Sequence, residues 1–186
     1  MLKIRNEKTY TTDEFIEYSS NHEGRFELIN GFIYNMSSPT VNHQRIVKFI
    51  SDVFTDFFRN KKCEVFISPL DVYLSESDIF QPDVFVVCDM NKISDNGIHG
   101  APDLVVEVVS KSTASNYYLL KCYKYMTNDV KEYWIVDYQS SQILKCTNID
   151  NYSLAEYDLS KIESTIFNGL VVDFSNLEVQ KEQETC

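Results

Sequence analysis

Two carboxylic acids, Asp83 and Glu107, lie in the most apolar segments of the chain. Asp83 begins the segment 83–88, and Glu107 lies late in the segment 103–109. Both segments have the nearly continuous apolar character of strands that are covered on both faces of a sheet. Antiparallel pairing of these strands would bring the two carboxylates to the same edge. We therefore predict that the two acids form one site.

The position of Glu107 predicts a cation beside it. Valines flank this residue on both sides, and an ionised carboxylate is costly to bury unless a cation or hydrogen-bond donors compensate it. Mg²⁺ or Mn²⁺ is the candidate, because such hard cations prefer one or two carboxylates together with water and phosphate oxygens. This chemistry activates water against a phosphodiester when a lysine is also near. The pair therefore predicts metal-dependent phosphodiester hydrolysis and requires a nearby lysine.

Helices and strands alternate along the rest of the chain. Thr11 and Glu14 have the spacing of a capping box, which predicts a helix to about residue 20. Asn30-Gly31 predicts a type I′ turn in a hairpin. Apolar periodicity predicts helices over 41–60 and 114–127, and strands over 63–68, 70–74, 132–137 and 142–145. This order predicts an α/β protein with a mixed central β-sheet flanked by helices.

Composition limits the class of protein. The 186 residues include 44% hydrophobic and 24% charged residues and no linker-like stretch, which predicts one domain over 1–186 with an acidic tail from about 177. No apolar run approaches the roughly 20 residues of a membrane span, and the first residues lack a signal-peptide core. We therefore expect a cytoplasmic protein with no membrane partner. The five scattered cysteines form no CxxC pair and are predicted to be reduced and free of zinc.

Several motifs together resemble one known family. They are Pro82-Asp83, the segment 102–110 ending in Glu-Val-Val-Ser, Ser112-Thr113, Lys121, Tyr125 and the segment 132–137 (Glu-Tyr-Trp-Ile-Val-Asp), with 26–31 and 43–47 in the N-terminal half. This pattern resembles the Uma-two family of proposed restriction endonucleases, in the PD-(D/E)XK nuclease superfamily. The resemblance covers most of the chain.

The resemblance implies roles for particular residues. It implies a restriction-endonuclease-like core in which Asp83 and Glu107 bind the metal and Glu27 is a further acidic residue at the site. The superfamily commonly has a lysine two residues after the glutamate, where this chain has Val109, and Lys121 is implied as the displaced catalytic lysine. The chain departs from the family at Lys111, where proline is common, and at Tyr117, where aspartate is common.

Each candidate also has a structural interpretation. Glu27 alternates with apolar residues and could face water on an edge hairpin, and His43 could be a satisfied histidine beside the helical stripe. Lys121 could be a solvated lysine with a buried stem. Asp103 begins its strand, so we expect it at the end opposite to Glu107. Strand alternation favours core or interface positions for Trp134 and Tyr133 over a role in base stacking.

Two hypotheses for function follow. The first is a Mg²⁺- or Mn²⁺-dependent endonuclease acting on DNA, in which the Val108 carbonyl completes the metal shell of Asp83 and Glu107, and Lys121 assists the attacking water. A homodimer is expected, because cutting both strands of a duplex needs two sites or two events. The second is an inactive nuclease-fold module that binds protein or nucleic acid. Two features favour the second hypothesis: the net charge of −11, because DNA affinity depends on basic residues, and Tyr117 in place of the aspartate common in the family.

Overall fold

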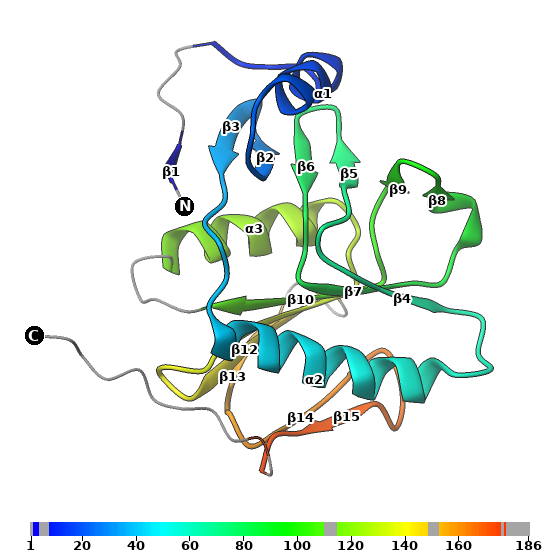
Figure 1. Cartoon of the computed structure of the whole chain (residues 1–186). Helices are drawn as coiled ribbons and strands as arrows, with labels where there is room; N and C mark the ends of the chain where they lie inside the picture. Colours follow the sequence, from blue (N-terminus) through cyan, green and yellow to red (C-terminus); the bar gives the residue numbers. More distant parts are fainter. Residues whose placement is uncertain (1, 4–7, 110–114, 149–152, 176, 178–186) are drawn as a thin grey trace, which may run out of the picture.

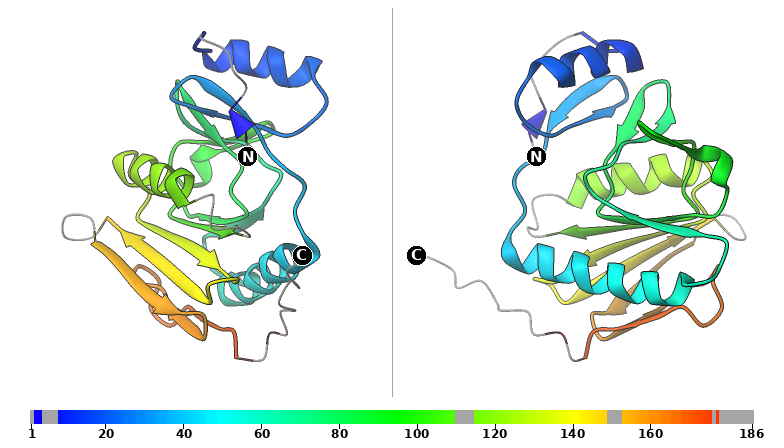
Figure 2. Two further views of the ribbon diagram at one scale, coloured as in Figure 1. Left: turned by 90° about the vertical axis from the view of Figure 1, so that its left-hand side faces the viewer. Right: turned by 45° about the vertical axis from the view of Figure 1, so that its right-hand side comes forward.

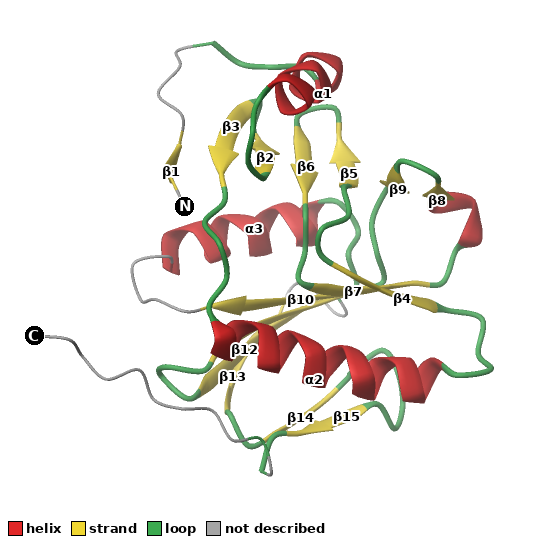
Figure 3. Ribbon diagram, in the orientation of Figure 1, coloured by secondary structure: helices red, strands yellow, loops and turns green. Residues whose placement is uncertain are grey.

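The computed structural model describes residues 2–3, 8–109, 115–148, 153–175 and 177, with the backbone alone at 2–3 and 115–117. Its elements in chain order are β1 (Leu2–Lys3), α1 (Thr12–Asn21), β2 (Phe26–Ile29), β3 (Phe32–Asn35), α2 (Val41–Phe58), β4 (Glu64–Ile67), β5 (Val72–Ser75), β6 (Asp78–Phe80), β7 (Val84–Val87), the 3₁₀ helix η1 (Met90–Lys92), β8 (Ile93–Ser94), β9 (Gly97–His99), β10 (Leu104–Val109), α3 (Ser115–Thr127), β11 (Glu132–Asp137), β12 (Gln142–Thr147), β13 (Ser153–Asp158), β14 (Lys161–Glu163) and β15 (Val171–Asp173). Figures 1 and 3 show this mixture of helices and strands. The α/β class is therefore as predicted, while the predicted acidic tail lies almost entirely outside the described residues.

Local sequence signals place the first elements. The Thr11 side chain accepts a hydrogen bond from the Glu14 backbone N–H at 3.3 Å, and the Glu14 carboxylate accepts one from the Thr11 N–H at 2.9 Å. This capping box starts α1 where it was predicted. Asn30 and Gly31 have φ angles of 51° and 75° and form the turn between β2 and β3. Both predictions are confirmed, because each depends on residues close together in the chain.

A six-stranded sheet lies at the centre of the fold, in the order β13-β12-β11-β10-β7-β4. Its β10 and β11 strands are parallel, while its other neighbours are antiparallel, so the sheet is mixed as predicted. Val84 of β7 pairs with Val106 of β10. The next residues outward are Asp83 and Glu107. The predicted antiparallel pairing of their strands is therefore confirmed.

Two helices cover the two faces of this sheet. Figure 2 shows α2 on one face and α3 on the other. Trp134 faces α2, where its ring meets Phe54 at a centroid distance of 5.6 Å. Tyr133 faces the other way and packs against Tyr125 of α3 at 4.8 Å. Both strand residues are fully buried, so their predicted core positions are confirmed. In the described part of the chain, no helix combines the length and the apolar character needed to cross a membrane.

A second large sheet was not predicted. Seven strands in the order β1-β3-β2-β6-β5-β9-β8 form this sheet, with α1 packed against it through Phe15. The sequence gives little sign of it, because β6, β8 and β9 have only two or three residues each, too few for a periodic signal. The chain passes from β6 of this sheet to β7 of the six-stranded sheet through residues 81–83, and so the two sheets meet beside Asp83.

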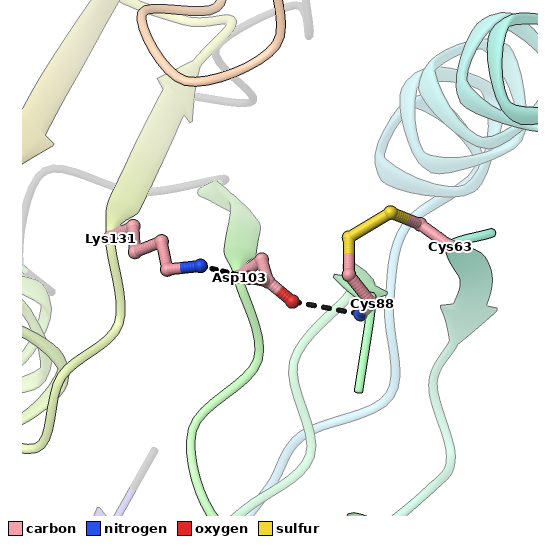
Figure 4. Close-up of a disulfide and its surroundings, with 4 residues drawn as sticks. All are labelled: Cys63, Cys88, Asp103 and Lys131. Atoms are coloured by element: carbon pink, nitrogen blue, oxygen red, sulfur yellow. Dashed lines mark hydrogen bonds and ion pairs between the residues drawn. A yellow bond between two sulfur atoms is a disulfide. The ribbon is translucent and has the colours of Figure 1, made fainter. Parts of the chain in front are cut away.

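The prediction that all cysteines are reduced is wrong in this structure. Cys63 and Cys88 form a disulfide at neighbouring ends of β4 and β7, as Figure 4 shows. Cys122 of α3 and Cys146 of β12 form a second one. The partners are 25 and 24 residues apart, so only the pairing of strands and the packing of α3 bring them together.

Candidate functional site

Asp83 lies immediately before β7 and contacts two other predicted site residues. Its Oδ2 atom accepts a hydrogen bond from the Val108 backbone N–H at 2.8 Å. The same oxygen lies 3.1 Å from His43 Nε2, which must carry the proton because a carboxylate oxygen can only accept. His43 occupies the first turn of α2, where its N–H is capped by the Thr40 hydroxyl at 3.2 Å. Asp83 therefore connects the β10 strand to the first turn of α2.

Lys121 lies between the two glutamates of the predicted site. Its Nζ atom is 2.7 Å from Glu107 Oε1 and 2.8 Å from Glu27 Oε1. The lysine is 1% exposed, Glu107 is 4% exposed and Glu27 is fully buried. The alternative interpretations, a solvated Lys121 and a water-facing Glu27, are therefore wrong. Lys121 reaches the site from α3, on the face of the sheet that Glu107 shares.

Two residues that were assigned no role contact this site. The Tyr125 hydroxyl donates to Glu107 Oε1 at 3.3 Å, and the Gln81 backbone N–H donates to Glu27 Oε1 at 2.8 Å. Tyr125 lies one helical turn after Lys121, so helical spacing could have found it. Gln81 acts through its backbone, for which the sequence carries no signal. Of the two departures from the family pattern, Lys111 lies outside the described residues and only the backbone of Tyr117 is described.

Burial and charge shift the pKa values of the ion pair. Burial raises the pKa of Glu107 to about 8, and the charges of Asp83 and Glu27 add to this effect, while Lys121 opposes it. Burial acts to lower the pKa of Lys121, but Glu107 and Glu27 outweigh it and raise that pKa. Lys121 therefore stays an ammonium at neutral pH, held between the side chains of Glu27 and Glu107.

The pKa of His43 shows which other groups converge here. Burial acts to lower this pKa, but the hydrogen bond and charge of Asp83 outweigh it, with further contributions from the Glu107 charge and the Val108 carbonyl. The net shift is upward. Asp83, Glu107 and the Val108 backbone are thus close neighbours of one imidazole ring.

The donor atoms suit a hard divalent cation. The described contacts of Asp83 use Oδ2 and those of Glu107 use Oε1. Among the described residues, Asp83 Oδ1 and Glu107 Oε2 have no hydrogen-bond partner, so each acid retains an oxygen for a ligand. No group of three or more His, Cys, Asp and Glu side chains in the described ranges is arranged to hold a metal. Two carboxylates and a carbonyl fit Mg²⁺ or Mn²⁺, which complete their shells with water and phosphate oxygens.

Comparisons with known proteins show the family of this chain. Residues 12–179 match the model of the Uma2 family, described as "Putative restriction endonuclease". This chain belongs to the Uma2 family. The match includes all the predicted site residues, from Glu27 and His43 to Asp83, Glu107, Val108 and Lys121. Membership supports the predicted restriction-endonuclease-like core.

Relatives of this Uma2 protein include two from Synechocystis sp. (strain ATCC 27184 / PCC 6803 / Kazusa). "Uncharacterized protein slr1290" is 25% identical over 181 residues, covering 85% of this chain and 91% of the relative. "Uncharacterized protein sll1609" is 27% identical over 117 residues, covering 61% of this chain and 66% of the relative, just under two thirds. A crystal structure of a putative nuclease belonging to DUF820 from Anabaena variabilis ATCC 29413 matches with a TM-score of 0.62. At 19% identity over 77% of this chain and 83% of that one, it shows a shared fold.

Asp103 follows a proline, as Asp83 does, but lies elsewhere. Its carboxylate accepts from the Cys88 backbone N–H at 2.8 Å and from Lys131 Nζ at 2.6 Å, as Figure 4 shows. Because Asp103 precedes β10 whereas Glu107 lies near its end, the two acids occupy opposite ends of the strand. The prediction that Asp103 lies at the end opposite to Glu107 is confirmed.

Proposed function

We propose that this Uma2 protein is a Mg²⁺- or Mn²⁺-dependent endonuclease that hydrolyses DNA phosphodiester bonds. The observation that carries the proposal is the meeting of Asp83, Glu107 and Lys121. They come from the start of β7, the end of β10 and the middle of α3. Two buried acids with open oxygens, beside a lysine that stays charged at neutral pH, form a site with the chemistry of phosphoryl transfer.

Each residue has a role that follows from its contacts. Asp83, Glu107 and the Val108 carbonyl would hold the cation, and His43 orients Asp83 through its Nε2–H. When bound, the cation supplies an activated water and a positive charge toward the phosphodiester. Lys121 orients Glu107 and offers its ammonium to the attacking water or the phosphate. Glu27, fixed by the Gln81 N–H, holds Lys121 in place.

The test combines metal binding with cleavage. Titration of purified protein with Mg²⁺ or Mn²⁺ in a calorimeter should give a heat signal that Glu107→Gln removes. Plasmid and single-stranded DNA should be cut only with metal, and Asp83→Asn should lower the rate at least about 100-fold. The matched control Asp103→Asn, at the opposite end of β10, should retain both signals. Cleavage that survives Asp83→Asn would contradict the proposal.

One observation favours a second candidate function, an inactive module that binds protein or nucleic acid. Lys121 already neutralises charge on Glu27 and Glu107, and the whole chain carries a net charge of −11. A site stabilised by its own lysine persists without metal. The same calorimetry separates the candidates: metal binding lost in Glu107→Gln supports the enzyme, and no heat with either metal supports the module.

We further propose that the enzyme works as a homodimer. The reason for the dimer is chemical, since two sites are needed to cut both strands of a duplex in one encounter. Sedimentation of the full chain at several concentrations tests it. A monomer that nevertheless cuts both strands at once would contradict the dimer and leave the proposed chemistry intact.

A further inference from the structure

An acidic nuclease needs positive charge where its substrate lies. Because the net charge is −11, the described basic side chains that no carboxylate neutralises are the candidates to contact DNA. Lys121, Lys124 and Lys131 each form an ion pair with a buried acid. Arg25 differs from them.

Arg25 is partly buried at the entrance to β2, and it binds neutral groups. Its Nε–H donates to the Gln81 side-chain oxygen at 3.2 Å, and an Nη2–H donates to the Ser68 hydroxyl. The Gln81 amide nitrogen donates in turn to Asp71 at 2.9 Å, so Gln81 stands between the arginine and that acid. No carboxylate among the described residues forms an ion pair with Arg25, and its positive charge is uncompensated at contact distance.

The two partners of Arg25 connect it directly to the proposed site. The Ser68 N–H donates to the Asp83 carbonyl at 3.2 Å, and the Gln81 N–H donates to Glu27 Oε1 at 2.8 Å. One residue, Ser68, therefore links the guanidinium to Asp83 through hydrogen bonds, and another, Gln81, links it to Glu27. Its position is fixed by the same backbone that fixes Asp83 and Glu27.

We propose that Arg25 binds a backbone phosphate of the DNA beside the scissile phosphodiester and thereby sets the position of the strand on the site. A guanidinium has five N–H donors, of which the described contacts use two, and its planar fork matches phosphate oxygens. Such a contact fixes register without reading sequence. This inference rests on the proposed function, because it assigns a substrate contact to that same site.

The experiment measures DNA binding by the full chain without divalent cation, so that no cleavage occurs. Fluorescence anisotropy with a short duplex, over about 50–200 mM KCl, gives the slope of log K against log salt. Arg25→Gln should reduce that slope by about 0.9, the value for one lost phosphate contact. The matched control is Arg59→Gln, an exposed arginine of α2's end that pairs with Asp56, and it should leave the slope unchanged.

A second variant covers the case in which Arg25→Gln does not fold, which a thermal melt reveals. Arg25→Lys keeps the charge but loses the fork, so binding should weaken about three- to tenfold with the slope retained. Binding within about twofold of the wild type would overturn the inference. An unchanged slope in a folded Arg25→Gln variant would overturn it while leaving the proposed nuclease intact. A wild-type protein that shows no salt-dependent DNA binding would overturn both proposals.

Discussion

Two buried glutamates on neighbouring parallel strands show how a site differs from a structural contact. Glu132 of β11 is fully buried, and its Oε2 accepts from the Ser164 hydroxyl and from the backbone N–H groups of Thr165 and Ile166, at 2.8–3.2 Å. Its other oxygen accepts from the Trp134 indole at 2.5 Å. Both oxygens of Glu132 therefore bind neutral donors, and the carboxylate joins β11 to the segment after β14.

Glu107 of β10 is buried almost as deeply but bound differently. Its Oε1 meets one ammonium and one phenol, and its Oε2 has no partner in the described chain. Neutral donors on both oxygens complete Glu132 as a structural group, whereas a single cation and an open oxygen leave Glu107 able to take a ligand. Glu107 and Glu132 are both buried glutamates on strands of one sheet. Only their hydrogen-bond donors distinguish the proposed ligand-binding role of Glu107 from the structural role of Glu132.

The largest effect on stability should come from removing the Lys121 ammonium. Lys121→Met leaves Glu27 and Glu107 buried without their ammonium, and we expect a loss of about 3–5 kcal/mol in the free energy of unfolding. Urea unfolding at neutral pH measures this loss. Adding Glu107→Gln to the variant should restore part of it. A change below about 1 kcal/mol would show that the ion pair is not held as described.

The next experiment replaces each of the two glutamates by glutamine and compares the effects. Glu132→Gln presents an amide N–H₂ to neighbouring donors and should cost about 1–3 kcal/mol of stability, while the folded fraction keeps its metal binding and cleavage. Glu107→Gln should abolish both activities at a smaller cost in stability, because Lys121 retains Glu27. Unfolding curves and cleavage rates for the two variants give the comparison. Loss of metal binding in folded Glu132→Gln would contradict the distinction.

Asp78 of β6 binds both neutral donors and a lysine, and its contribution to stability should depend on pH. Burial acts to raise its pKa, but the Asn30 N–H, the Ser75 hydroxyl and Lys124 outweigh this, so the pKa is lowered. An acid with a lowered folded-state pKa stabilises the fold above its unfolded pKa of about 3.9, and that stabilisation is lost as the pH falls through the folded value. The difference in unfolding free energy between wild type and Asp78→Asn should therefore be constant near neutral pH and shrink below about pH 4. A difference that does not change with pH would mean that Asp78 titrates alike in both states.

The smallest effect should come from the other end of β10. Lys131 pairs with Asp103 at 2.6 Å but is 61% exposed, so solvent screens the pair. Lys131→Met should cost about 0.5 kcal/mol and leave metal binding and cleavage unchanged. Urea unfolding and the cleavage assay check this. A cost as large as that of Lys121→Met would show that position along β10 does not separate structure from site.

The sequence by itself determined the longer helices and strands and the central pair of acids. Thr11 with Glu14 and Asn30 with Gly31 act within a few residues, so their signals survive without knowledge of the fold. The apolar segments 83–88 and 103–109 predicted buried strands, and an acid at each edge predicted where they would meet. Local periodicity and the cost of a buried charge were sufficient for these conclusions.

Only the tertiary structure decided what compensates Glu107. The sequence predicted a metal ion or donors there, and Lys121 reaches Glu107 across 14 positions and Glu27 across 94. The second sheet, both disulfides and the Gln81 and Ser68 contacts likewise depend on short strands and on distant partners. Their physical reason is shared: contacts between distant residues leave no periodic trace in the chain, and they form only when the sheets and helices pack.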